Sequence, residues 1–208
     1  SLDPTAQVLQ GLLIYGVMPV WLLAGFGDWL LHRRQRIEEM VGWREPALHL
    51  LMVAEITVGL AAALLLQITA AVLVLLLGVA IAHELTVWRD LSFASARRRI
   101  AVPEQWAHAL QIVIPWMALG MLAVIYRDQV GAILRGGGAD WSLRLKEAPL
   151  PLVQVLAIVV GGAMLVGFPF VEELWRGVRA SRRSARLATR HRSPTQVDRR
   201  VEPGATSI

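Results

Sequence analysis

The chain contains no cysteine, which excludes a disulfide framework and any thiolate metal site. It also lacks a glycine-rich phosphate loop and a GxSxG nucleophile elbow. The stretch HELTV at 83–87 begins like an HExxH metalloprotease helix but has no second histidine. The opening SLDPT has no basic segment ahead of an apolar one, so we expect no signal peptide.

Long runs of apolar residues are the main feature of the sequence. The chain is 55% hydrophobic and only 18% charged, with a mean hydropathy of +0.51, and a soluble domain of this size carries more charge. A helix needs ~20 apolar residues to cross a bilayer core of ~30 Å. Five runs reach or approach that length, at about 8–31, 47–66, 70–87, 106–126 and 150–175. We therefore predict an all-α polytopic membrane protein rather than a soluble helical one. Its transmembrane domain, 1–178, would hold a four-helix bundle and one peripheral fifth helix.

Arginines between the runs set the expected orientation. Basic clusters follow the first and third runs, and the segment 179–208 is basic again, which places three basic segments on one side of five spans. The N-terminus is then expected outside and the C-terminus in the cytoplasm, as in a bacterial inner membrane. The tail 179–208 is expected to be disordered, or partly helical on the membrane surface. Lipid headgroups are sufficient partners for this charge, and no nucleic-acid partner is expected.

Two segments of the chain resemble each other and point to an internal repeat. DWLLHRRQRIEEMVGWREPALH starts at Asp28, and DLSFASARRRIAVPEQWAH starts at Asp90. Both run from an aspartate through an arginine cluster to a glutamate that stands four residues before a histidine. Each is predicted to join the end of one span to the start of the next at the cytoplasmic side.

The repeat gives each of the first four spans one carboxylate and one imidazole. Spacings of four and seven residues place two side chains on one face of a helix. All the pairs lie at the same end of their spans, and such groups are costly inside a membrane unless they pair or bind a metal. The pairs are Asp28 with His32, Glu45 with His49, His83 with Asp90, and Glu104 with His108.

An acid and an imidazole from each of four helices are the ligand inventory of a two-metal site. Carboxylates offset the charge of two divalent cations and bridge them, while imidazoles complete the coordination. The set resembles the ferritin-like di-iron and di-manganese carboxylate proteins in ligand type and bundle geometry. It departs from them in its spacing of four rather than three and in offering a histidine on every helix. We expect two divalent ions, with iron preferred and zinc or manganese as alternatives.

The predicted function is a membrane metalloenzyme that oxidises or oxygenates a lipid-soluble or amphiphilic substrate, supplied by an electron donor. Glu55 and Glu84 are candidate catalytic proton carriers. Arginines 33, 34, 89 and 97–99 are topology signals, or alternatively an anion clamp over the site. Three other functions stay open: a dizinc membrane hydrolase, a b-type haem electron-transfer protein, and a metal or proton transporter. The transporter is disfavoured because spans two to four carry few polar residues beyond the site.

Overall fold

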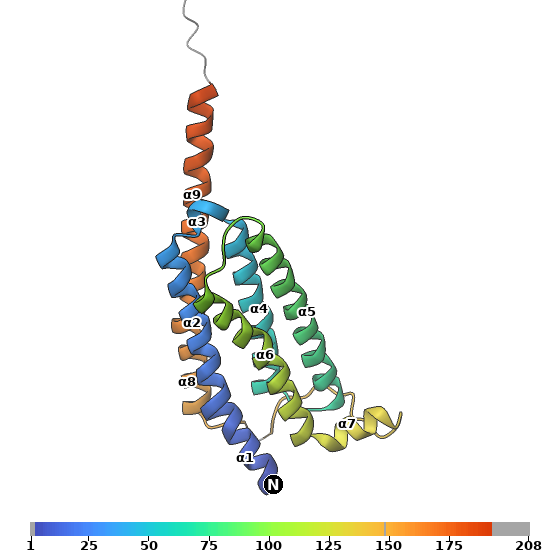
Figure 1. The fold of residues 1–208 in the computed structure, drawn as a ribbon. Coiled ribbons are helices and arrows are strands. Elements are labelled where there is room, and N and C mark those ends of the chain that lie inside the picture. The colour runs from blue at the N-terminus through green and yellow to red at the C-terminus, as the bar shows by residue number, and fades with distance from the viewer. Residues whose placement is uncertain (1–2, 148, 193–208) are drawn as a thin grey trace, which may run out of the picture.

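The computed structural model describes residues 3–147 and 149–192 (Figure 1). Its regular elements in these ranges are helices, apart from one isolated bridge between Leu66 and Leu145. In chain order the elements are α1 (Pro4–Leu12), the π-helix η1 (Leu13–Val17), α2 (Met18–Gln35), α3 (Glu38–Val41), α4 (Arg44–Leu65), α5 (Ala70–Ser95), α6 (Val102–Ile125), α7 (Arg127–Leu134), α8 (Leu152–Gly162), the π-helix η2 (Ala163–Gly167) and α9 (Phe168–Arg192).

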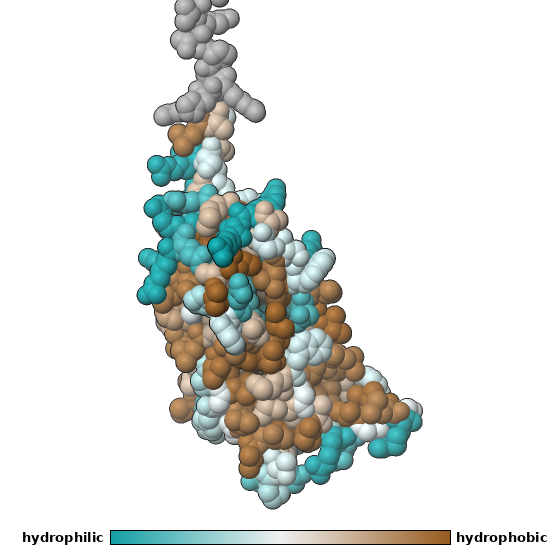
Figure 2. Space-filling model, in the orientation of Figure 1, coloured by the Kyte–Doolittle hydropathy of each residue, from teal (hydrophilic) through white to brown (hydrophobic). Residues whose placement is uncertain are grey.

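Five continuous helical segments are long and apolar enough to cross a membrane, and each overlaps one of the predicted runs. They are Pro4–Gln35, Arg44–Leu65, Ala70–Ser95, Val102–Ile125 and Leu152–Thr189. Figure 2 shows apolar residues over most of one face, between hydrophilic residues at the α3 end and others near α7. The all-helical prediction is confirmed, and the segments pack as a helical bundle whose N-terminus lies at the end opposite α3 (Figure 1).

Two of these segments contain a π-helical turn at a comparable place. η1 ends two residues before Pro19, and η2 ends two residues before Pro169. A proline inside a helix has no N–H to donate, and its ring clashes with the carbonyl four residues earlier. The wider π turn accommodates this ring without ending the helix. Both π turns therefore follow from a proline that the sequence places within an apolar run.

The second and third segments form the tight hairpin that the short connection LQIT predicts. Thr69 caps α5, because its side chain accepts a hydrogen bond from the backbone N–H of Val72 at 3.4 Å. Ile68, Val72 and Leu76 pack with Ala62 in the buried apolar cluster below the turn. This hairpin holds α4 and α5 in register at the end remote from the histidines.

The fifth segment is not peripheral to the histidines, contrary to the prediction. α9 packs against α2, α3 and α4. Gly177 permits this contact, because a Cβ there would lie only 2.6 Å from the carbonyl oxygen of Gly42. Gly42 itself has a φ of 67° in the turn between α3 and α4, a conformation that glycine adopts without strain. Two glycines thus allow the backbone of α9 to approach the bundle closely.

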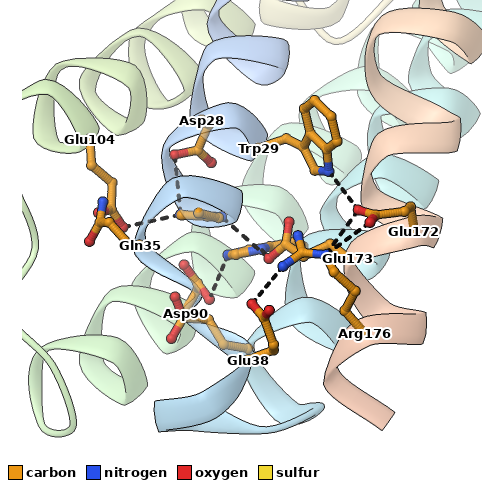
Figure 3. Close-up of polar contacts among 12 residues, drawn as sticks. Asp28, Trp29, Gln35, Glu38, Asp90, Glu104, Glu172, Glu173 and Arg176 are labelled. Atoms are coloured by element: carbon orange, nitrogen blue, oxygen red, sulfur yellow. Dashed lines mark hydrogen bonds and ion pairs between the residues drawn. The ribbon is translucent and has the colours of Figure 1, made fainter. Parts of the chain in front are cut away.

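A polar network next to this contact also holds α9 against α2 and α3. Glu172 accepts hydrogen bonds from Trp29 and Arg176, at 3.1 and 3.0 Å, and Arg176 also donates to Glu38 at 2.5 Å (Figure 3). α9 then continues beyond the bundle to Arg192, so residues 179–192 are helical. For that part the helix agrees with the partly helical alternative rather than with a disordered tail, and residues 193–208 lie outside the described residues.

Candidate metal centre

All eight predicted ligands are buried, and they lie at the α3 end of the bundle. Each has a relative exposure of 6% or less. Such burial is unusual for ionisable groups, because each loses its hydration. Four different helices, α2, α5, α6 and α9, contribute carboxylates to the site. Figure 3 labels these residues, which are Asp28, Asp90, Glu104 and Glu173.

A first group of four ligands joins α2 to α6. One donor atom from each residue lies within 4.8 Å of all the others, and the group consists of Asp28, His32, Glu104 and His108. Nε2 of His32 is 3.1 Å from Oε1 of Glu104 and 3.4 Å from Oδ1 of Asp28. Nε2 of His108 is also 3.4 Å from Oδ1 of Asp28. Two imidazoles and two carboxylates therefore converge on a space the size of one metal ion.

A second group adjoins the first and adds ligands from α4. It consists of His32, Glu45 and His49, again with one donor atom each within 4.8 Å. The rings of His32 and His49 stack with their centroids 4.8 Å apart, so the two groups are in direct contact. Asp90 joins this group from α5, with its Oδ1 3.3 Å from Nε2 of His49. Carboxylate and imidazole donors thus surround two neighbouring positions.

The two repeated segments contact each other through equivalent pairs of side chains, in which the aspartate of one segment meets the histidine of the other. Asp28 and Asp90 are equivalent in the two repeated segments, as are His49 and His108. Asp28 contacts His108 at 3.4 Å and Asp90 contacts His49 at 3.3 Å, so each aspartate meets the histidine of the other half. The repeat is therefore visible in the pairing of the side chains.

Glu173 on α9 is a site residue that the sequence analysis missed. It has no exposed surface, and its Oε1 lies 3.0 Å from Nδ1 of His49 and 3.3 Å from Nδ1 of His32. One carboxylate thus contacts the Nδ1 atoms of both histidines, whereas their Nε2 atoms face the other carboxylates. Metal-binding histidines commonly hold such an outer carboxylate, which fixes the ring orientation. The sequence signal was available, because Glu173 is an acid inside the apolar run 150–175.

Arg98 closes the α3 end of the site. It lies in the connection between α5 and α6, is buried, and donates from Nε to Glu45 at 3.0 Å and from Nη1 to Glu104 at 3.0 Å. Burial alone lowers the pKa of its guanidinium, but the hydrogen bonds to Glu104 and Glu45 outweigh burial and raise that pKa above its usual value. The anion clamp considered from the sequence thus binds carboxylates of the chain itself.

His83 and the two candidate proton carriers lie beside the two groups. Nδ1 of His83 is 3.6 Å from Oε2 of Glu55, and Glu55 accepts a hydrogen bond from the Thr86 hydroxyl at 2.8 Å. Glu84 accepts a hydrogen bond from Nε1 of Trp116 at 3.1 Å and is partly exposed. Among the eight predicted ligands, only His83 has neither a described contact with another of them nor a place in either group. The proton-carrier role of Glu55 and Glu84 stays a prediction.

The chemistry of this donor set fits divalent cations. Several buried donor atoms have no hydrogen-bond partner in the described part of the chain, among them Asp28 Oδ1, His49 Nε2 and Asp90 Oδ1. Nε2 of His49 and Oδ1 of Asp90 lie 3.3 Å apart without a hydrogen bond, and Oδ1 of Asp28 lies 3.4 Å from Nε2 of His108. A cation bound between such atoms would offset the cost of burying them. The residues therefore could hold a metal ion, and their oxygen and imidazole donors suit iron, zinc or manganese.

Charge balance gives an independent reason for cations at this site. The described residues bury five carboxylates, from Asp28, Glu45, Asp90, Glu104 and Glu173, against the single guanidinium of Arg98. With neutral imidazoles and ionised acids, four negative charges stay uncompensated. Two divalent cations neutralise them. In the absence of metal, protons on the imidazoles have to do so.

Comparison of the chain with protein-family models, with curated proteins and with solved structures finds no match.

Proposed function

We propose that this protein is an integral membrane metalloenzyme whose two-metal carboxylate and histidine centre oxidises or oxygenates a lipid-soluble substrate. The observation that carries the proposal is the excess of buried carboxylates around two adjoining groups of ligands. One metal would be held by Asp28, His32, Glu104 and His108. The other would be held by Glu45, His49 and Asp90, with Glu173 fixing the rings of His32 and His49.

Membrane insertion is part of this proposal. The five apolar segments and the arginines at the α3 end support a chain that crosses a bilayer five times, with the metal centre near the cytoplasmic side and the N-terminus outside. A centre at this end of the spans would lie near the headgroups, where a lipid-soluble or amphiphilic substrate can reach it.

Oxidation is favoured over hydrolysis by the surroundings of the site. Arg98 and its two glutamates close the polar end, and the deepest ligands line an apolar cavity rather than an aqueous cleft. Hydrolysis consumes water, which such a site restricts. Oxygen dissolves well in apolar surroundings. A hydroxylation balances as R–H plus O₂, two electrons and two protons, giving R–OH and water.

Haem is disfavoured by the close pairing of acids with imidazoles. The Nε2 atoms of His32, His49 and His108 each lie within 3.4 Å of a carboxylate oxygen. Haem iron needs axial imidazoles but no carboxylate beside each of them. Bound iron would supply redox chemistry, while the chain's carboxylates and imidazoles would position it and exclude bulk water.

Metal analysis of the purified full-length protein, with an optical spectrum, tests the proposal. The expected result is two irons per chain and no Soret band. A Soret band would replace the two-metal centre with haem. Two zinc ions and no iron would support a hydrolase instead of an oxidising enzyme, because the same ligands bind zinc. Protein that binds none of these after reconstitution with iron, zinc or manganese would overturn the metal centre itself.

A further inference from the structure

A cavity of about 330 Å³ reaches the metal centre from the apolar side of the bundle. Its polar lining includes Asp28, His49, His83 and Gln111, so it touches one ligand from each of the two groups. Oδ1 of Asp28 and Nε2 of His49 have no hydrogen-bond partner in the described residues. The cavity therefore ends at ionisable side chains of the proposed metal centre.

A second cavity of about 180 Å³ lies beside the first, against residues of α5 and α6. Six residues line both cavities: Met18, Trp21, Ile56, Leu60, Leu64 and Ile158. Along α4 the lining of the first cavity extends from His49 to Leu64, and 15 residues at 1.5 Å per residue correspond to about 22 Å. That length is a large part of a bilayer core of ~30 Å. The space is long and apolar, with polar donors at the metal end.

The first cavity opens sideways, on the apolar surface of the bundle. Four of its lining residues are exposed, namely Thr57 and Ala61 on α4, Val159 on α8 and Ala163 on η2. Gly162 and Gly167 also line it, so the wall formed by α8 and η2 carries little side-chain bulk there. A membrane around the five segments would place acyl chains directly at this opening. The polar end, by contrast, is closed by Arg98.

From these features, and resting on the proposed function, we infer that the substrate is a long-chain apolar lipid that enters sideways from the bilayer between α4 and η2. Its chain lies along α4 in the first cavity, with one end beside Asp28 and His49. Elongated apolar space fits such a chain, and a compact polar molecule would leave most of it unfilled. A water-soluble substrate would meet the closed Arg98 end instead.

Photo-crosslinking of the full-length, metal-loaded protein in a lipid bilayer tests this inference. The probe is a long-chain fatty alcohol that carries a diazirine at mid-chain. The expected result is labelling concentrated on residues that line both cavities, such as Met18, Leu60 and Leu64. Equal labelling over all lipid-facing helices would overturn the inference.

Two alanines of α4 provide a matched pair of variants. Ala61 lines the cavity mouth, whereas Ala54 is equally exposed on the same helix and lines neither cavity. Ala61→Phe is expected to lower labelling of the cavity about tenfold, because a phenyl group occupies the entrance. Ala54→Phe should label like the wild type. Equal labelling of the two variants would also overturn the inference.

Metal content measured on the same samples separates this inference from the proposed function. Both phenylalanine variants should retain the wild-type metal content, because neither alanine is a ligand. Bound metal without concentrated labelling overturns the lipid site alone. Concentrated labelling in a chain that binds no metal overturns the proposed enzyme and leaves a lipid-binding cavity.

Discussion

Oε1 of Glu173 lies 3.0 Å from Nδ1 of His49, although the two residues are 124 positions apart in the chain. The same oxygen is 3.3 Å from Nδ1 of His32. A single carboxylate of α9 thus orients one imidazole from each of the two ligand groups. This contact makes the fifth helix a part of the centre.

Replacing Glu173 should therefore weaken metal binding without removing a proposed ligand. Outer carboxylates of this type contribute about 10–100-fold to metal affinity, and we expect a loss of this size for Glu173→Gln. The adjacent Glu172→Gln is the matched control, because Glu172 contacts Trp29, Arg33 and Arg176 and no imidazole. Metal titration of the two variants measures the difference. Equal affinity in both would remove Glu173 from the centre.

Arg98 should contribute strongly to stability. Arg98→Ala leaves Glu45 and Glu104 buried without their guanidinium, and breaking a buried ion pair in this way costs about 3–5 kcal/mol. The neighbouring Arg97 is exposed over the ring of Phe93, so Arg97→Ala should change the free energy of unfolding by less than about 0.5 kcal/mol. Thermal unfolding of metal-free protein in detergent compares them. A small effect for Arg98→Ala would mean that water or protons compensate both carboxylates.

The close approach of α9 gives a test that touches no charged group. Gly177→Ala places a Cβ 2.6 Å from the oxygen of Gly42 and 2.9 Å from Cα of Trp43, so the helix has to move outward. Displacement of Glu173 should then lower metal affinity together with stability. Gly27→Ala in α2 meets nothing within 4 Å and should be neutral or slightly stabilising. Wild-type metal affinity in Gly177→Ala would show that the position of α9 does not matter to the centre.

The orientation in the membrane is testable separately. Arginines flank the α3 end of the segments, and five crossings place the connections after residue 40 and after residue 140 on opposite sides. Reporter fusions at these two positions should report the cytoplasm for the first and the outside for the second. Signals from the same side would contradict the five-span topology, whatever the state of the metal centre.

The sequence predicted the helices and most of the buried cluster of acids and histidines because both depend on local spacing. Four residues rise about 6 Å along a helix, so an acid and a histidine at this spacing reach one ion. Seven residues rise about 10.5 Å, so Asp90 reaches His49 while His83 lies two turns away beside Glu55. The spacing of seven residues therefore predicts the correct face of α5 for His83, but it does not predict its position along the helix axis.

Glu173 and Arg98 depended on tertiary packing, which local spacing does not determine. The α9 approach rests on two glycines, Gly42 and Gly177, that meet across 135 residues of chain. Arg98 stands between two other arginines, and only the path of the connection from α5 to α6 directs it inward. An arginine cluster alone gives no reason to choose its middle member.

Removal of individual histidines tests the assignment of ligands most directly. His49→Ala and His108→Ala should each lose at least one metal, because each removes an imidazole whose Nε2 faces a carboxylate. Glu45→Ala and Glu104→Ala should behave alike, since their charge balances the cations. His83→Ala should retain both metals, because His83 faces Glu55 rather than either group. His191→Ala, in the basic tail, serves as a second control. Metal-to-protein ratios on the six variants provide the measurement.

Full metal content in all six would reduce the cluster to a buried network of ion pairs. Loss of metal in His83→Ala would return that histidine to the ligand set that the sequence first indicated. A haem protein would respond differently, since the histidine variants would lose the cofactor and the glutamate variants would keep it.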